Sequence, residues 1–153
     1  MTIMRHIAWV AVLYCLSQSG VMANPLGKSF QPIQQFANAY ALADTNKAVD
    51  AFSPRASMFG ITGDRLLTNK KDIREHFRVV FRAIKAESHR ALTFIHIRKV
   101  NIASSAVLFV GIGVFSQSKA GRARNLYARF SFLVFKGKHG WKILHYHSSK
   151  QPS

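Results

Sequence analysis

The residues best suited to chemistry lie near the C-terminus, at positions 140–149. This segment begins with a glycine turn and continues with the alternation typical of a final β-strand. Because strand side chains repeat every two residues, one face is predicted to hold Trp141, Ile143, His145 and His147. Two imidazoles on one face could hold an anionic ligand, move a proton or ligate a metal.

A metal site would require a third ligand beside this histidine pair. His96, in an earlier predicted strand, is the additional imidazole best placed for it, and no carboxylate is close in sequence. We therefore expect no metal and no cofactor. Alternatively, His145 and His147 are structural residues that form hydrogen bonds with Ser148 and Ser149.

Arg129 lies between Ala128 and Phe130, in an apolar part of another predicted strand. A buried guanidinium must be paired or must receive an anion, whereas one on the convex face of a sheet can reach water. The sequence leaves both orientations open. Arg124, nearer the hairpin, is expected to be exposed.

The acidic residues offer little for catalysis. Asp44, Asp64 and Asp72 occupy positions typical of helix caps and turns, and no acid falls in the four long predicted strands. A carboxylate base inside a sheet-lined pocket would have to come from a helix or loop. A histidine mechanism with Tyr40, His96 or His145 stays open, and we assign no residue as catalytic.

The first 23 residues have the features of a secretory signal peptide. A short basic start precedes an apolar run at 7–16, which is too short to span a membrane, and cleavage is expected after Ala23. Cys15 is the single cysteine and lies within that run. We therefore expect an exported chain, periplasmic or secreted, whose domain at 24–153 has no disulfide or thiolate nucleophile.

Charge is the second strong signal. The 153 residues include 22 Lys and Arg against 6 Asp and Glu, a formal net charge of +16. Such a surplus favours association with acidic polymers or an acidic membrane surface. The basic ridge of Arg74, Arg78 and Arg82 has no interleaved aromatic residues to stack bases, so specific nucleic-acid binding is not expected.

The order of predicted elements indicates an α+β fold. A helix begins near Pro32, a short helix follows Asp44, and the Ser53-Pro54 pair is expected to end it. Short strands at 56–61 and 65–68 precede an amphipathic helix at 70–86. Four long antiparallel strands at 91–102, 105–117, 124–135 and 141–148 complete a curved sheet wrapped by the helices on one side.

This order resembles the NTF2-like (SnoaL-like) α+β cone. The segments Ala128-Arg-Phe-Ser-Phe-Leu-Val-Phe135 and Gly140-Trp-Lys-Ile-Leu-His-Tyr-His-Ser-Ser149 resemble the association domain of calcium/calmodulin-dependent protein kinase II and its bacterial stand-alone relatives. In those domains, arginines of the pocket receive a carboxylate. The resemblance therefore implies a cone with a pocket at its wide end and Arg129 as an anion anchor. No kinase motif is present, so phosphoryl transfer is excluded.

Three functions are compatible with the sequence. The first is an exported, non-catalytic binding and association module whose pocket holds a small anionic or carboxylate ligand through Arg129, His145, His147, His96 and Tyr40. The second is a SnoaL-like enzyme of the lyase or isomerase type with a pocket histidine. The third is a periplasmic protein that binds polyanions through its basic surface. A homodimer formed through the apolar open face of the sheet, at 108–110 and 130–135, is expected.

Overall fold

The computed structural model describes residues 26–85, 87 and 89–152. The predicted signal peptide lies outside these residues. In the described part of the chain, no helix has both the length and the apolar character needed to cross a membrane.

The helices in the described part of the chain lie between Lys28 and Ile84. A 3-10 turn at Lys28–Phe30 leads into α1 at Gln31–Leu42, which is followed by α2 at Thr45–Asp50 and α3 at Lys70–Ile84. As expected from the sequence, Asp44 caps α2 by accepting from the Lys47 amide at 3.0 Å. Asn69 caps α3 by accepting from the Asp72 amide at 2.9 Å. Side-chain oxygens thus satisfy amide donors that have no partner inside each helix.

The sheet has five strands in the order β1-β5-β4-β3-β2. Neighbouring strands are antiparallel except β1, which runs parallel to β5. The strand bounds are Phe52–Phe59 for β1, His89–Ala103 for β2, Ala106–Lys119 for β3, Arg122–Gly137 for β4 and Gly140–Lys150 for β5. The α+β fold with a curved, mostly antiparallel sheet is therefore confirmed.

Two local predictions need correction. Helix α2 ends at Asp50, before the Ser53-Pro54 pair as expected, but the strand expected from residue 56 already begins at Phe52, so both residues lie within β1. Proline is tolerated because β1 is the edge strand, where a missing amide donor costs no ladder bond on the open side. The expected strand at 65–68 is reduced to a single bridge between Met58 and Leu67.

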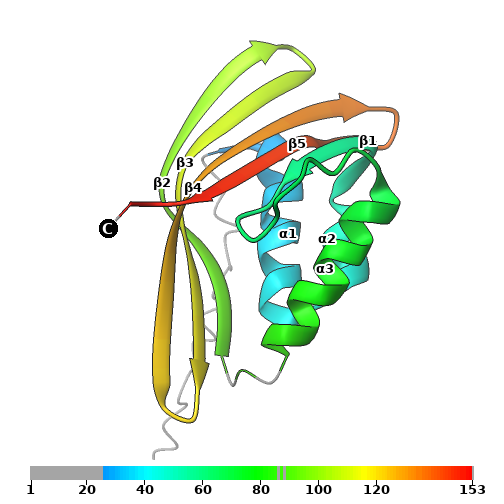
Figure 1. Cartoon of the computed structure of the whole chain (residues 1–153). Helices are drawn as coiled ribbons and strands as arrows, with labels where there is room; N and C mark the ends of the chain where they lie inside the picture. Colours follow the sequence, from blue (N-terminus) through cyan, green and yellow to red (C-terminus); the bar gives the residue numbers. More distant parts are fainter. Residues whose placement is uncertain (1–25, 86, 88, 153) are drawn as a thin grey trace, which may run out of the picture.

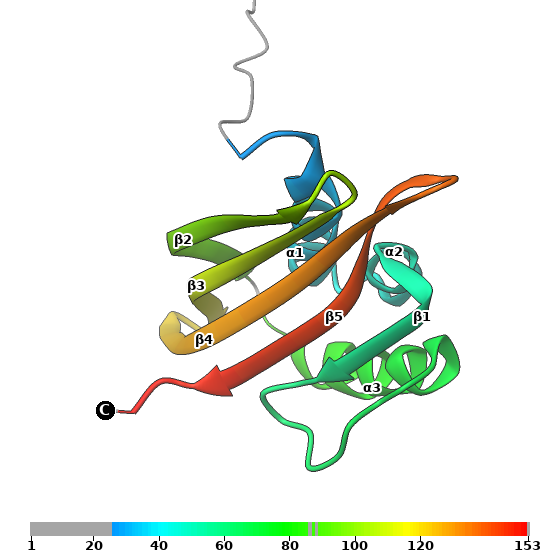
Figure 2. The same cartoon turned by 90° about the horizontal axis from the view of Figure 1, so that it is seen from above.

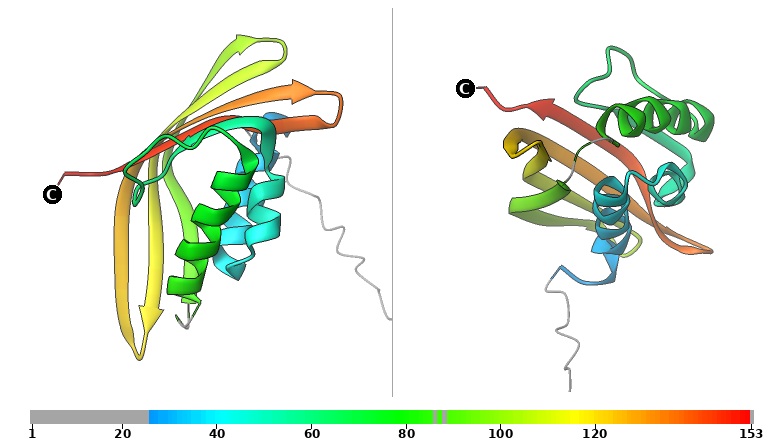
Figure 3. Two further views of the ribbon diagram at one scale, coloured as in Figure 1. Left: turned by 45° about the vertical axis from the view of Figure 1, so that its right-hand side comes forward. Right: turned by 90° about the horizontal axis from the view of Figure 1, so that it is seen from below.

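Glycines and bulges allow the sheet to coil. The pairing shifts between Phe94 and His96, and again between Leu133 and Val134, opposite Leu144. At Gly111, a Cβ atom would lie 1.9 Å from the His96 carbonyl oxygen, so only glycine allows β2 to cross β3 this closely. The resulting sheet bends around α1, α2 and α3, which all lie on its concave side (Figure 1; Figure 3).

The core fills the concave side with aromatic rings. Phe132 of β4 stacks on Tyr146 of β5 with centroids 4.4 Å apart, and Phe36 of α1 lies 5.4 Å from both Tyr146 and Phe77 of α3. Viewed from above, the helices form one layer against the sheet (Figure 2). Within the part of the chain that the structure describes, the opposite, convex face carries no helix.

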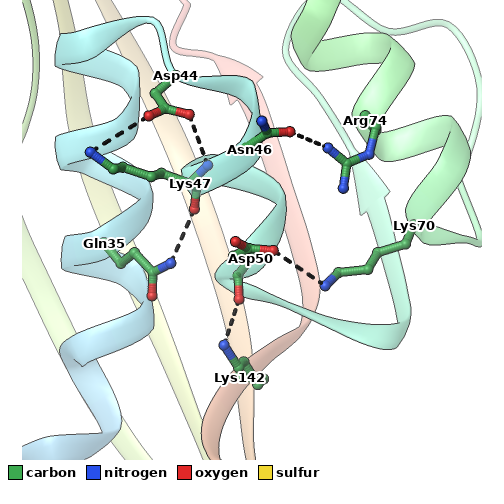
Figure 4. A network of polar contacts seen from close by, with 8 residues as sticks. All are labelled: Gln35, Asp44, Asn46, Lys47, Asp50, Lys70, Arg74 and Lys142. Atoms are coloured by element: carbon green, nitrogen blue, oxygen red, sulfur yellow. Dashed lines mark hydrogen bonds and ion pairs between the residues drawn. The ribbon is translucent and has the colours of Figure 1, made fainter.

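Polar contacts fix the helices to one another (Figure 4). Gln35 of α1 donates to the Lys47 carbonyl at 3.1 Å, and Arg74 of α3 donates to the Asn46 side chain. Lys142 of β5 donates to the Asp50 carbonyl at 2.6 Å. These contacts connect α1, α2, α3 and β5, and so position the face of α3 that lines the cavity described next.

A candidate ligand-binding cavity

The sheet and helices enclose a cavity of about 860 Å³. It lies between α1 and α3 and the ends of β3, β4 and β5 near the β3–β4 hairpin. A volume in this range suits a drug-sized small molecule. Most of the wall is apolar, and its large apolar side chains include Phe36, Ile61, Phe77, Phe81, Ile84, Phe115 and Leu126.

Tyr40 supplies one polar group of the wall. Its hydroxyl accepts a hydrogen bond of 2.6 Å from Nε2 of Gln117, which fixes the phenol between α1 and β3. Burial raises the pKa of Tyr40, and the bond from Gln117 opposes part of that rise. The hydroxyl is therefore protonated at neutral pH and keeps its proton for donation.

Tyr146 and Ser148 supply polar groups from β5. Burial raises the pKa of Tyr146, with the Ser148 hydroxyl opposing part of the shift. The Ser148 hydroxyl is itself buried beside the Tyr146 phenol, and it forms no hydrogen bond of normal geometry within the described chain. A buried hydroxyl without a partner costs free energy. Ser148 is thus available to a ligand in the cavity that it lines.

His76 enters the cavity from α3. Its ring is close to Gly60, where an added Cβ would lie 2.9 Å from Nε2, so glycine makes room for the imidazole. Burial lowers the pKa of His76, which favours the neutral ring. His76 also lines a smaller neighbouring pocket of about 250 Å³, which contains Asp64, Asp72 and Glu75. It therefore lies between an apolar cavity and an acidic surface pocket.

Arg124 lies at the rim of the cavity. It is exposed, as expected, but it also lines the cavity and pairs across the strands with Gln117. No Asp or Glu is among the described residues that line the cavity. The rim therefore presents a cation without an acidic partner, and the sequence alone gave no sign that Arg124 would reach the cavity.

Of the five predicted ligand contacts, the structure places one in the cavity. Tyr40 lines it. The expectation that the other four face the cavity is wrong, because they lie on the convex face of the sheet. These four residues are His96, Arg129, His145 and His147.

The bulge at Leu144 explains the error at the histidines. Before the bulge, Ile143 is buried in the core, and after it the buried positions are Tyr146 and Ser148. The extra residue shifts the alternation by one, so His145 and His147 leave the face that Ile143 occupies. Similarly, Phe130 and Phe132 face the core, which directs Arg129 outwards.

The structure gives His145 a partner other than the expected one. Its Nδ1 lies 2.8 Å from the hydroxyl of Ser57 on β1, and not against Ser148 or Ser149. Burial lowers the pKa of His145, and the neighbouring His147 adds to the effect. Within the described residues, no three His, Cys, Asp or Glu side chains gather as a metal site.

Comparison with protein families identifies the fold family of the chain. The model of a "SnoaL-like domain" matches residues 31–153, which is nearly all of the described chain. A comparison with curated proteins gave no match.

Many solved structures share the fold. One, provisionally described as a calcium/calmodulin-dependent protein kinase II association domain from Xanthomonas campestris, has a TM-score of 0.70 and 16% identity, over 79% of this chain and 84% of that one. An NTF2-like protein with a cystatin-like fold from Novosphingobium aromaticivorans has a TM-score of 0.71 and 9% sequence identity, over 82% of this chain and 81% of that one. A ketosteroid isomerase-like protein from Erwinia carotovora atroseptica has a TM-score of 0.64 and 15% sequence identity, over 82% of this chain and 95% of that one. At these identities the likeness concerns the fold alone.

Proposed function

Because the chain belongs to the SnoaL-like domain family, with its NTF2-like α+β fold, we propose that it binds a small, largely apolar molecule in the cavity between α1, α3 and the sheet. The observation that carries the proposal is the buried Ser148 hydroxyl, which lines this cavity and forms no hydrogen bond of normal geometry within the described chain. A ligand oxygen placed there would satisfy it.

The charge of the rim suggests a carboxylate on the ligand. Arg124 is the cation at the rim, and the cavity wall holds no acid among the described residues. A carboxylate would pair with a planar guanidinium through charge-assisted hydrogen bonds. The expected small anionic ligand is therefore retained, with Arg124 in place of Arg129 as its anchor.

A matched pair of fluorescent probes tests this proposal. Anthracene-2-carboxylate and anthracene-2-methanol share an apolar body and differ in charge. We expect both probes to bind. Arg124→Gln should lower the affinity for the carboxylate probe by about threefold to fivefold, as for the loss of an exposed ion pair, and leave the affinity for the alcohol probe unchanged. Arg122→Gln, an equal charge change at the same hairpin, is the control. Absence of binding by both probes would contradict the proposal.

A second candidate function is proton transfer, which His76 favours. A neutral imidazole in an apolar cavity could remove a proton from a carbon beside a ligand carbonyl, while a hydroxyl of Tyr40, Tyr146 or Ser148 donates to the oxygen. The probe is 2-tetralone in D₂O, whose α-hydrogens exchange for deuterium when it enolises. Exchange above the buffer rate that disappears in His76→Gln supports an enzyme, and exchange at the buffer rate leaves only the binding function.

Three further expectations complete the proposal. The chain is exported after cleavage near Ala23, which N-terminal sequencing of the mature protein would test. It pairs with a second copy through the convex face, where Tyr127 and Phe135 are 46% and 39% exposed. Its basic surface attracts acidic polymers or an acidic membrane surface, and such binding should weaken steeply as salt is added.

A further inference from the structure

Two polar groups of the cavity lie far apart along β4. Ser148 of β5 pairs with Phe130, and Arg124 precedes Phe130 by six positions on β4, next to the β3–β4 hairpin. Ala128 and Phe130 are buried on the concave side, so the alternation of the strand directs Arg124 to that side as well. A strand rises about 3.3 Å per residue, so about 20 Å of β4 separate the two polar groups.

Helix α3 gives a second measure of the same length. Its cavity-lining residues extend from His76 to Ile84, which is about 12 Å of helix axis at about 1.5 Å per residue. The C-terminal end of α3 and the β3–β4 hairpin lie at the same end of the molecule (Figure 1; Figure 3). At the other end, His76 lies close to Gly60, which follows the last pair of β1 with β5, just before Ser148. The cavity is therefore elongated, with Arg124 and Ser148 at opposite ends.

The two ends differ in charge. Arg124 is the one Lys or Arg among the described residues that line the cavity. At the inner end, Ser148 and Tyr146 offer uncharged hydroxyls, and burial lowers the pKa of His76, so that this ring is neutral at neutral pH. A carboxylate at the inner end would be desolvated without a cation beside it. A ligand therefore places its carboxylate at Arg124 and an uncharged oxygen at Ser148.

We infer that the cavity takes a linear carboxylic acid with a hydroxyl or carbonyl oxygen at its far end, of the class of the ω-hydroxy fatty acids. This inference rests on the proposed function, and it adds the length of the ligand and its second polar group. An extended chain advances roughly 1.2 Å per single bond, so a distance of about 12–20 Å corresponds to about 10–16 carbons. The cavity lies on the concave side, so a second copy paired through the convex face leaves it accessible.

Ser148 is the residue that determines the preference for an oxygen at the far end. A ligand that ends in a methyl group leaves the buried Ser148 hydroxyl without a hydrogen bond, whereas a terminal hydroxyl or carbonyl satisfies it. A site with such a polar group rejects the analogue that lacks the matching oxygen. Length matters equally, because an acid held at Arg124 reaches Ser148 only when its chain covers the distance between them.

The test is displacement of a bound anthracene probe, followed by its fluorescence, with two pairs of acids. The long pair is 12-hydroxydodecanoate and dodecanoate, and the short pair is 6-hydroxyhexanoate and hexanoate. Ser148→Ala should lower the affinity for 12-hydroxydodecanoate by about tenfold and leave the affinities for the other three acids unchanged. Arg124→Gln should lower the affinities for both long acids by about threefold to fivefold. Ser149→Ala, on the convex face, is the control that should change none of them.

The wild-type protein provides a readout that does not depend on any variant. It should bind 12-hydroxydodecanoate at least as tightly as dodecanoate, although the hydroxyl must leave water. Weaker binding of the hydroxy acid would overturn the inference. Displacement is converted to affinity with the affinity of the probe measured in each variant, and a urea midpoint close to that of the wild type verifies that Ser148→Ala is folded.

The remaining outcomes separate this inference from the proposed function. If neither anthracene probe binds the wild-type protein, the proposed function fails and the inference fails with it. If a probe binds but Ser148→Ala changes both long acids equally or changes neither, the inference is overturned and the proposed function stands. An equally large effect on 6-hydroxyhexanoate would also overturn it, because a short acid cannot contact both ends.

Discussion

Tyr146 and His147 are neighbours in sequence, but their side chains lie on opposite faces of the sheet and serve different surfaces. Tyr146 stacks on Phe132 in the core and lines the cavity, whereas His147 pairs with Ser131 on the convex face. The strand therefore contributes to the cavity and to the convex face at once. The bulge at Leu144 decides which residue faces which side of the sheet.

The hydrogen bond between Gln117 and Tyr40 should contribute measurably to stability. Gln117→Leu removes the donor and leaves a buried phenol oxygen without that partner, so we expect a loss of about 1–2 kcal/mol in the free energy of unfolding. Urea denaturation measures it. Gln34→Leu, at an exposed position of α1, should change stability by less than about 0.5 kcal/mol. Equal losses in both variants would show that the bond is unimportant.

Stability should fall in mild acid because of two partly buried histidines. The pKa values of His76 and His145 are lowered from 6.5 in the folded chain, chiefly by burial. The unfolded chain therefore binds more protons as the pH falls below about 6.5, and the folded state loses stability from that point down to the lowered pKa.

The measurement compares urea midpoints at pH 7.5 and pH 5. The difference should shrink in His76→Gln and in His145→Gln, since glutamine does not titrate. His139→Gln, at an exposed hairpin position, should keep the wild-type difference. A pH response that is unchanged in both buried-site variants would assign the effect to other groups.

The close approach of β2 to β3 should make Gly111 intolerant of any side chain. Gly111→Ala would place a Cβ 1.9 Å from the His96 carbonyl oxygen, and a backbone atom cannot move aside without breaking the pairing. We expect a loss of about 3 kcal/mol or more, or failure to fold. Thermal denaturation of both variants measures this loss. Gly137→Ala, with open space around the added atom, should have a nearly unchanged stability.

Arg90 should be needed to hold the ends of α1 and α3 against β2. Its guanidinium donates to the carbonyls of Ala41, Lys85 and Glu87, at 3.2, 3.1 and 2.6 Å. Arg90→Met keeps much of the apolar stem and leaves these oxygens without the donor, so a loss of about 2 kcal/mol is expected. Arg98→Met, on the convex face, should cost far less. A small loss at Arg90 would mean that water replaces the guanidinium.

The sequence predicts most of this fold because its signals are local and periodic. Asp44 caps α2 as expected, and the amphipathic helix expected at 70–86 is α3, whose apolar side chains Ile73, Phe77 and Phe81 are all buried. The site is less predictable, because β-bulges decide which side of the sheet each side chain of a strand points to. A single extra residue at Leu144 reverses the orientation of His145 and His147, and no local pattern around it signals that reversal.

The cavity residues His76 and Arg124 illustrate a second limit. His76 belongs to an amphipathic helix, where its position gives no sign of a site, and in the structure its ring lies close to Gly60 and lines the cavity. Gly60 and His76 come from different elements, so their contact depends on how α3 packs on the sheet. A glycine before a turn, near a histidine-bearing helix, is a signal that could have suggested it.

Ser148→Ala should affect ligand binding but not the stability of the fold. The wild-type hydroxyl is buried and forms no hydrogen bond of normal geometry among the described residues, so its removal should leave stability unchanged or raise it by up to about 1 kcal/mol. The same change should weaken the binding of anthracene-2-methanol, because the oxygen of the bound probe loses its hydrogen-bond donor. Ser149→Ala, one residue further and on the convex face, should not affect this probe. A marked loss of stability in Ser148→Ala would indicate that the hydroxyl is already satisfied in the folded protein, and the binding proposal would lose its main support.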